Sequence, residues 1–278
     1  MKKQQVILLA GATVLFCAIY FFGKTTPPKK STATTVASGN TYNIDKVLEA
    51  SRAQLTAEER TRLAQLENSV VRGNVQAQKA AIYKQIAEFY RDTAHLLIPF
   101  AYYTGQAAKL ENSEKSLTFA ARFFLDNARK QDDDGLKKWM ANESKELFEK
   151  ALVLNPGSDS LKVGLGSCYI FGNIADNPMQ GIMMIREVAE RDPSNMYAQL
   201  MLGIGGLMSG QLDRAIERLN VVATKEPANL EAKIMLAEAY ERKGDKQNAV
   251  KWYEAVKSQI SNPEIIQELN KRIQTLKR

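Results

Sequence analysis

The sequence predicts an all-α protein: helical hairpins stacked into an α-solenoid, with an N-terminal transmembrane helix and a C-terminal capping helix. Three observations support this fold class. Residues 6–23 contain no charged side chain. Pro156, Pro193 and Pro227 recur at nearly equal spacing, between stretches whose apolar residues follow the helical period. Residues 263–278 place their apolar side chains on one helical face.

Residues 1–5 form a short tail, and the uncharged segment then runs from Val6 to Gly23. At about 1.5 Å per residue these eighteen residues span roughly 27 Å, close to the ~30 Å hydrocarbon core of a bilayer. A cleaved signal peptide is the alternative. Its cleavage site requires small residues, whereas Phe21 and Phe22 stand at the end of this segment. We therefore expect an uncleaved single-pass anchor in the inner (cytoplasmic) membrane.

The segment after the anchor, residues 24–41, is rich in Thr, Ser and Pro and has no apolar period, which is typical of a linker. Lysines flank the anchor on both sides, so the positive-inside rule is nearly balanced. A short tail followed by a large soluble domain favours a domain outside the cytoplasm, which in a bacterium is the periplasm. A cytoplasm-facing adaptor that recruits soluble proteins is the alternative.

The net charge of +7 comes mainly from the N-terminus, because residues 1–40 contain five lysines and no acidic residue. Subtracting these five from the 38 Lys and Arg leaves 33 basic and 31 acidic residues in the remainder. Their charges alternate along the predicted helices, which is typical of a solvated face. A nucleic-acid site needs clustered Lys and Arg, so we expect no nucleic-acid partner.

Three successive units form the repeat: residues 159–195, 196–229 and 230–262. Small residues recur where the two helices of each hairpin are expected to cross; these are Gly166, Gly203 and Ala237 in the first helices and Gly181, Ala215 and Ala249 in the second. Gly210 and Gly244 fall at the turns between helices, where a left-handed residue is common. The first unit is longer within residues 172–180, which predicts a longer hairpin loop.

These units resemble the tetratricopeptide repeat family, of the single-pass membrane-anchored bacterial type. Residues 113–158 form an irregular fourth unit, and residues 42–112 a further helical region in which Thr56 and Glu59 have capping-box spacing. Residues 263–278 are expected to cap the stack. The resemblance implies a non-enzymatic scaffold for protein partners, and similar bacterial proteins serve as accessory or assembly factors for envelope complexes.

In the family, the first helix of each unit lines a binding groove. Carried over to this chain, the groove positions are Ser160, Val163, Ser167 and Ile170, then Tyr197, Leu200, Ile204 and Leu207, and then Glu231, Ile234, Glu238 and Glu241. The middle unit is apolar at all four positions and the last is largely acidic. The Lys and Asn clamp of chaperone-binding members is missing. Either an apolar or amphipathic segment of a partner binds in this groove, or the upstream helices of the chain fill it.

Catalytic and metal motifs are missing from the sequence, which contains no HExxH, CxxC or GxSxG pattern. The single histidine, His95, is expected at a helix end. Asp132, Asp133 and Asp134 lack the alternate spacing of a calcium loop and are expected to start a helix. We therefore expect no cofactor, no metal and no small-molecule substrate.

Overall fold

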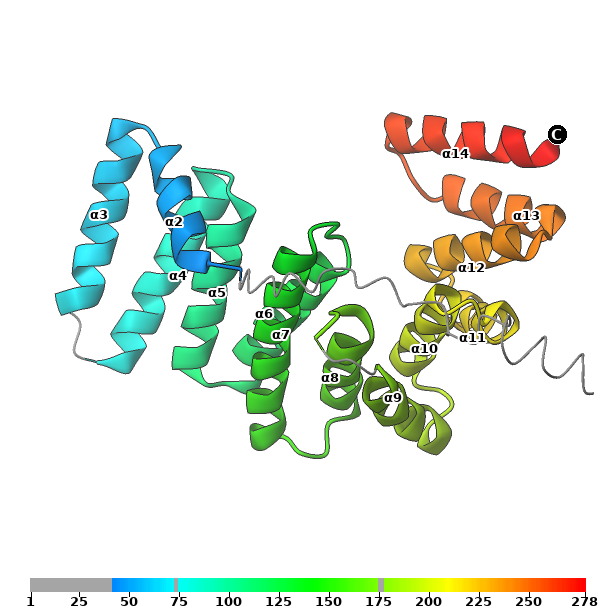
Figure 1. Ribbon diagram of the computed structural model, residues 1–278, viewed down its shortest axis with the longest axis horizontal. Helices are drawn as coiled ribbons and strands as arrows, with labels where there is room; N and C mark the ends of the chain where they lie inside the picture. Colours follow the sequence, from blue (N-terminus) through cyan, green and yellow to red (C-terminus); the bar gives the residue numbers. More distant parts are fainter. Residues whose placement is uncertain (1–41, 73–74, 175–177) are drawn as a thin grey trace, which may run out of the picture. The chain divides into compact units, whose positions relative to one another are not determined.

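The computed structural model describes residues 42–72, 75–174 and 178–278, and every regular element in these ranges is a helix (Figure 1). This agrees with the all-α prediction for that part of the chain. The predicted tail, anchor and linker, residues 1–41, lie outside the described residues. Among the helices that are described, none combines the length and the apolar composition needed to cross a membrane.

Four helices form the N-terminal part of the described chain: α2 (Ile44–Ala53), α3 (Ala57–Arg72), α4 (Gln76–Asp92) and α5 (Leu97–Glu111). The predicted capping box starts α3: Glu59 N–H donates to Thr56 Oγ1 at 3.2 Å, and Thr56 N–H donates to Glu59 Oε2 at 2.8 Å. Buried aromatic residues, among them Phe89, Tyr90 and Tyr103, hold these helices together.

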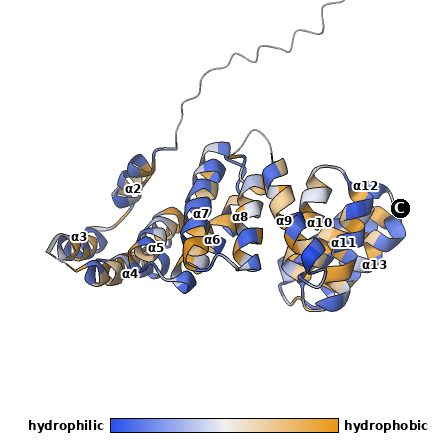
Figure 2. Ribbon diagram, turned by 90° about the horizontal axis from the view of Figure 1, so that it is seen from below, coloured by the Kyte–Doolittle hydropathy of each residue, from blue (hydrophilic) through white to orange (hydrophobic). Residues whose placement is uncertain are grey.

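Four hairpins and a final helix follow. They are α6 (Glu114–Ala128) with α7 (Asp134–Leu154), α8 (Asp159–Phe171) with α9 (Met179–Arg191), α10 (Met196–Met208) with α11 (Leu212–Lys225), α12 (Leu230–Lys243) with α13 (Lys246–Lys257), and α14 (Pro263–Lys277). The helices of these hairpins carry hydrophobic and hydrophilic residues side by side (Figure 2). Their hydrophobic residues form the clusters that join each hairpin to the next.

Local signals set where these helices begin. The first helix of each hairpin starts at a capping side chain whose oxygen accepts a backbone N–H three residues on; the caps are Ser113, Ser158, Asn195 and Asn229. Such caps satisfy backbone donors that have no partner inside the helix. Asn262 caps α14 in the same way, with Pro263 at its first helical position.

Glycines permit the turns and the close approach of helices within the hairpins. Gly210 and Gly244 have φ of 77° and 84°, the left-handed conformation expected for the turns. A Cβ atom on Gly181 would stand 2.2 Å from the backbone oxygen of Gly166, so α8 and α9 cross at a distance that excludes a side chain.

The stacking changes between the N-terminal helices and the repeats. The first helices α6, α8, α10 and α12 pack in series, each against the next. At the upstream end, α6 packs on α5. As a result, α4 and α6 stand on either side of α5 with a groove between them.

Candidate protein-binding site

A surface hollow of about 650 Å³ lies where α6, α8, α10 and α12 converge, and we call it the repeat hollow. Its lining residues are Asp126, Arg129, Lys130, Lys137, Phe171, Ile204, Leu207, Met208, Glu231, Ile234, Met235, Glu238 and Arg242. Apolar side chains from α8, α10 and α12 are thus surrounded by acidic and basic side chains. Five of the predicted groove positions, Ile204, Leu207, Glu231, Ile234 and Glu238, are brought together here.

The apolar residues of the repeat hollow differ in exposure. Ile204 and Leu207 are only 4% and 3% exposed and belong to the core between the hairpins. Met208 and Ile234 are 60% and 36% exposed. A partner would therefore meet Met208 and Ile234 first, with Ile204 and Leu207 supporting them from below.

Two arginines of the α6 segment contact predicted groove residues of the repeats. Arg129 forms an ion pair with Glu231 of α12, and its guanidinium lies 5.0 Å from the ring centroid of Phe171. Arg122 donates to Ser160 Oγ at 2.6 Å and lies 5.4 Å from the ring centroid of Tyr197. Burial raises the pKa of the Tyr197 phenol to about 12, against the opposing effect of the Arg122 charge.

The other predicted groove residues lie away from the repeat hollow. Val163, Ser167 and Leu200 are buried, and the Ser167 hydroxyl donates to the Val163 carbonyl at 2.8 Å. Ile170 lines a different hollow, together with residues of α9, α10 and α11. Glu241 accepts hydrogen bonds from Tyr253 at 2.9 Å and from Arg272 at 2.8 Å, so the following helices hold its carboxylate. A role of these residues in partner binding stays a prediction.

The sequence left open whether upstream helices fill the groove. In the structure α6 covers part of it, through Arg122 and Arg129. The helices of residues 42–112 contribute no residue to the lining of the repeat hollow. The groove is thus partly closed from within, and the repeat hollow is the part that stays accessible.

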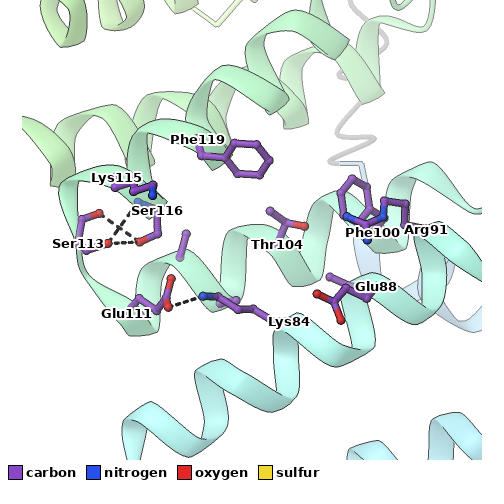
Figure 3. A pocket seen from close by; sticks show the side chains of 13 residues that line it. Lys84, Glu88, Arg91, Phe100, Thr104, Glu111, Ser113, Lys115, Ser116 and Phe119 are labelled. Carbon is purple, nitrogen blue, oxygen red and sulfur yellow. Dashed lines mark hydrogen bonds and ion pairs between the residues drawn. The ribbon is translucent and has the colours of Figure 1, made fainter.

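A second hollow, the upstream groove, has a volume of about 450 Å³ and lies between α4 and α6 over α5 (Figure 3). Small side chains such as Ala107 and Ala108 line it, and an ion pair joins Lys84 of α4 to Glu111 of α5. Phe119 of α6 stands at its edge with 62% of its surface exposed.

The upstream groove could not be predicted from the sequence, because the groove depends on how α6 packs on α5. One feature of the sequence does point to an exposed apolar residue beside this groove. Phe119 stands one turn from Lys115 and Arg122, on the charged side of an otherwise amphipathic helix, where a large apolar residue is unexpected.

Among the described residues, no group of three or more His, Cys, Asp or Glu side chains could hold a metal ion. His95 is exposed just after the end of α4, with Nδ1 3.0 Å from the carbonyl oxygen of Arg91. Asp133 caps α7 through the N–H of Leu136. Both residues therefore lie at helix ends, as their sequence context predicts.

The comparison with protein families identifies the downstream repeats. Residues 206–269 match the family model of the tetratricopeptide repeat. The match begins near the end of α10 and extends into α14, so it covers the hairpin of α12 and α13 completely. The comparison with curated proteins gives no match.

Several solved structures are similar to this chain, at low identity. The type IV pilus biogenesis factor PilW is 16% identical, with a TM-score of 0.47 over 70% of this chain and 92% of PilW. YrrB, a tetratricopeptide protein with an unusual peptide-binding site, is 18% identical, with a TM-score of 0.41 over 69% and 92%. A tetratricopeptide repeat protein from Parabacteroides merdae is 12% identical, with a TM-score of 0.41 over 84% and 99%.

Proposed function

We propose that this chain is a single-pass, membrane-anchored tetratricopeptide scaffold that binds a segment of a protein partner in the repeat hollow. In this role it serves as an accessory or assembly factor for an envelope complex, with its helical domain in the periplasm. The observation that carries the proposal is the repeat hollow itself, where exposed Met208 and Ile234 are surrounded by charged side chains from two hairpins, α6–α7 and α12–α13.

The composition of the repeat hollow favours an amphipathic partner segment. One or two apolar side chains of the partner would bury the exposed surfaces of Met208 and Ile234, which supplies affinity. Charged side chains on either side of them would meet Arg129, Lys130 and Glu238 at the rim. Because these rim charges have both signs, they would fix the direction in which the segment binds.

The uncharged segment at residues 6–23 supports the anchor, since its length suits a bilayer and lysines flank it on both sides. The anchor is tested by extracting membranes with alkaline carbonate and with high salt. We expect the protein to remain in the membrane fraction through both treatments. A reporter fused to the C-terminus then distinguishes a periplasmic domain from a cytoplasm-facing adaptor.

Site-specific crosslinking in cells tests the repeat hollow. A photoreactive amino acid is placed in the full-length protein at Met208 or Ile234, and at Val221 of α11 as the control. Val221 is 39% exposed and apolar, but it does not line the hollow. We expect the same partner protein to be crosslinked from both hollow positions and not from Val221. Equal yields from all three positions, or none from any, would rule out the hollow as the binding site.

A further inference from the structure

One face of α6 carries an exposed stripe of four residues, of which the last also lines the repeat hollow. It consists of Lys115, Phe119, Arg122 and Asp126, which we call the α6 stripe. All four residues are exposed; Phe119 is 62% exposed and the Asp126 side chain 61%. The opposite face of α6, including Leu117 and Phe124, is completely buried. The helix is therefore fixed by its own core and presents this stripe as a firm surface.

The spacing of the stripe is four, three and four residues, which is the spacing of a seam between two packed helices. A second copy of the stripe that runs in the opposite direction is complementary to the first in charge and in side-chain type. In an antiparallel pair of α6 helices, Lys115 of one copy would face Asp126 of the other, and Phe119 would face Arg122. Each contact occurs twice because a two-fold interface repeats it. The pair would thus contain two ion pairs and two contacts between a guanidinium and a ring.

We propose that the α6 stripe is the contact surface between two copies of this chain, which associate through antiparallel α6 helices. Charge complementarity favours a second copy of this chain as the molecule that binds to the stripe. A stripe with Lys at one end and Asp at the other matches its own reversed copy, with no need for a second protein. The seam extends over twelve residues, Lys115 to Asp126, about 16 Å. Such a short contact is smaller than most stable interfaces, so the dimer is weak and depends on concentration.

Contacts inside the chain leave Lys115 and Phe119 available, whereas Arg122 donates to Ser160 and lies over the Tyr197 ring. Lys115 has no ion-pair partner among the described residues. Asp126 is 4.0 Å from Arg129, whose main partner is Glu231. Phe119 is drawn in Figure 3 at the edge of the upstream groove, where its ring extends from α6 over the space beside it. Arg122 is held by Ser160, which fixes its guanidinium next to the stripe.

Disulfide trapping between two tagged copies tests the arrangement. Full-length Lys115→Cys and Asp126→Cys variants, both with Cys17→Ser, carry different tags and are mixed under mild oxidation in detergent. Within one copy the two positions are about 16 Å apart, too far for a disulfide. In the proposed pair they face each other across the seam. We expect a disulfide dimer containing both tags in the mixture, and none with either variant alone. Equal crosslinking by a single variant would overturn the antiparallel register.

Charge exchange provides an independent check by sedimentation of the full-length protein. Lys115→Glu should weaken association about tenfold, since it places like charges opposite each other at two sites. Adding Asp126→Lys should restore it. Phe119→Ser should weaken association about 100-fold or more, because it removes both ring contacts. A protein that stays monomeric at every concentration would overturn the proposal and would leave the stripe as a surface for a different protein.

Discussion

The surroundings of Cys168 determine the hydrogen bonds and the pKa of its thiol. The thiol is completely buried in α8, where it contacts Ser144 Oγ at 3.2 Å and the carbonyl oxygen of Gly164 at 3.3 Å. Ser144 in turn donates to the carbonyl of Ala121 at 2.7 Å. The Ser144 hydroxyl of α7 is therefore satisfied by hydrogen bonds on both sides. Burial raises the pKa of the Cys168 thiol to about 12.

This pKa predicts a thiol that reacts slowly at neutral pH. A raised pKa keeps the thiol protonated, so the reactive thiolate of Cys168 is scarce from pH 7 to pH 10. We expect native Cys168 to be alkylated at least about 100-fold more slowly than an exposed Ser258→Cys control, as followed by mass spectrometry. The control rate should level off above about pH 8.5, once its thiol is ionised, whereas the rate at Cys168 should stay low and still rise with pH up to pH 10, because its pKa is higher. A rate at Cys168 that levels off at the same pH as the control would contradict this prediction.

At the scale of helices, the sequence predicts the elements better than their packing. The starts of α3, α8 and α14 follow from Thr56, Ser158 and Asn262, because a cap acts within three residues of its own position. The period of the prolines and glycines likewise predicts the three hairpins. The sequence could not predict that Arg129 covers part of the predicted binding groove, because Arg129 and its partner Glu231 are 102 residues apart. Nothing in the 34-residue period specifies that contact.

The burial of the middle repeat leads to a prediction for Leu200. Its side chain is 6% exposed within the core between hairpins, so Leu200→Glu places a carboxylate where water cannot reach it. We expect this variant to lower the free energy of unfolding by about 3 kcal/mol or more. Ile234→Glu is the matched control, since Ile234 is partly open to solvent in the repeat hollow; its cost should be about 0.5–1 kcal/mol. Urea unfolding measures both variants, and similar costs would mean that Leu200 is not in the core.

At the scale of the whole repeat array, α14 closes the apolar end of the stack. Leu269 and Ile273 pack with Tyr253 and Val256 of α13, and Arg272 reaches back to Glu241 of α12. Without this helix the final hairpin would expose apolar surface to water, which promotes aggregation in repeat proteins.

Removal of residues 263–278 should therefore lower the melting temperature by several degrees and cause concentration-dependent aggregation. Ile273→Ala should reproduce part of the effect, with a loss of about 2–4 kcal/mol, because this side chain is only 3% exposed. Ile265→Ala, at an exposed position of the same helix, is the control and should change little. Thermal unfolding and light scattering measure these outcomes. A truncated protein with an unchanged melting temperature would show that α14 is not a cap.

The ion pair between Arg129 and Glu231 also bears on how the array unfolds. In most helical repeat proteins each unit touches only its neighbours, so stability is a sum of local terms and terminal units can fray independently. Here a side chain at the end of α6 holds the start of α12, with the two hairpins formed by α8 to α11 lying between them in the chain. Fraying of α12 must therefore break a contact to a distant unit as well as those to its neighbours. We therefore expect the hairpins from α6 to α13 to unfold together, so that the protection of their amides from hydrogen exchange is similar throughout and does not decline gradually towards the C-terminus.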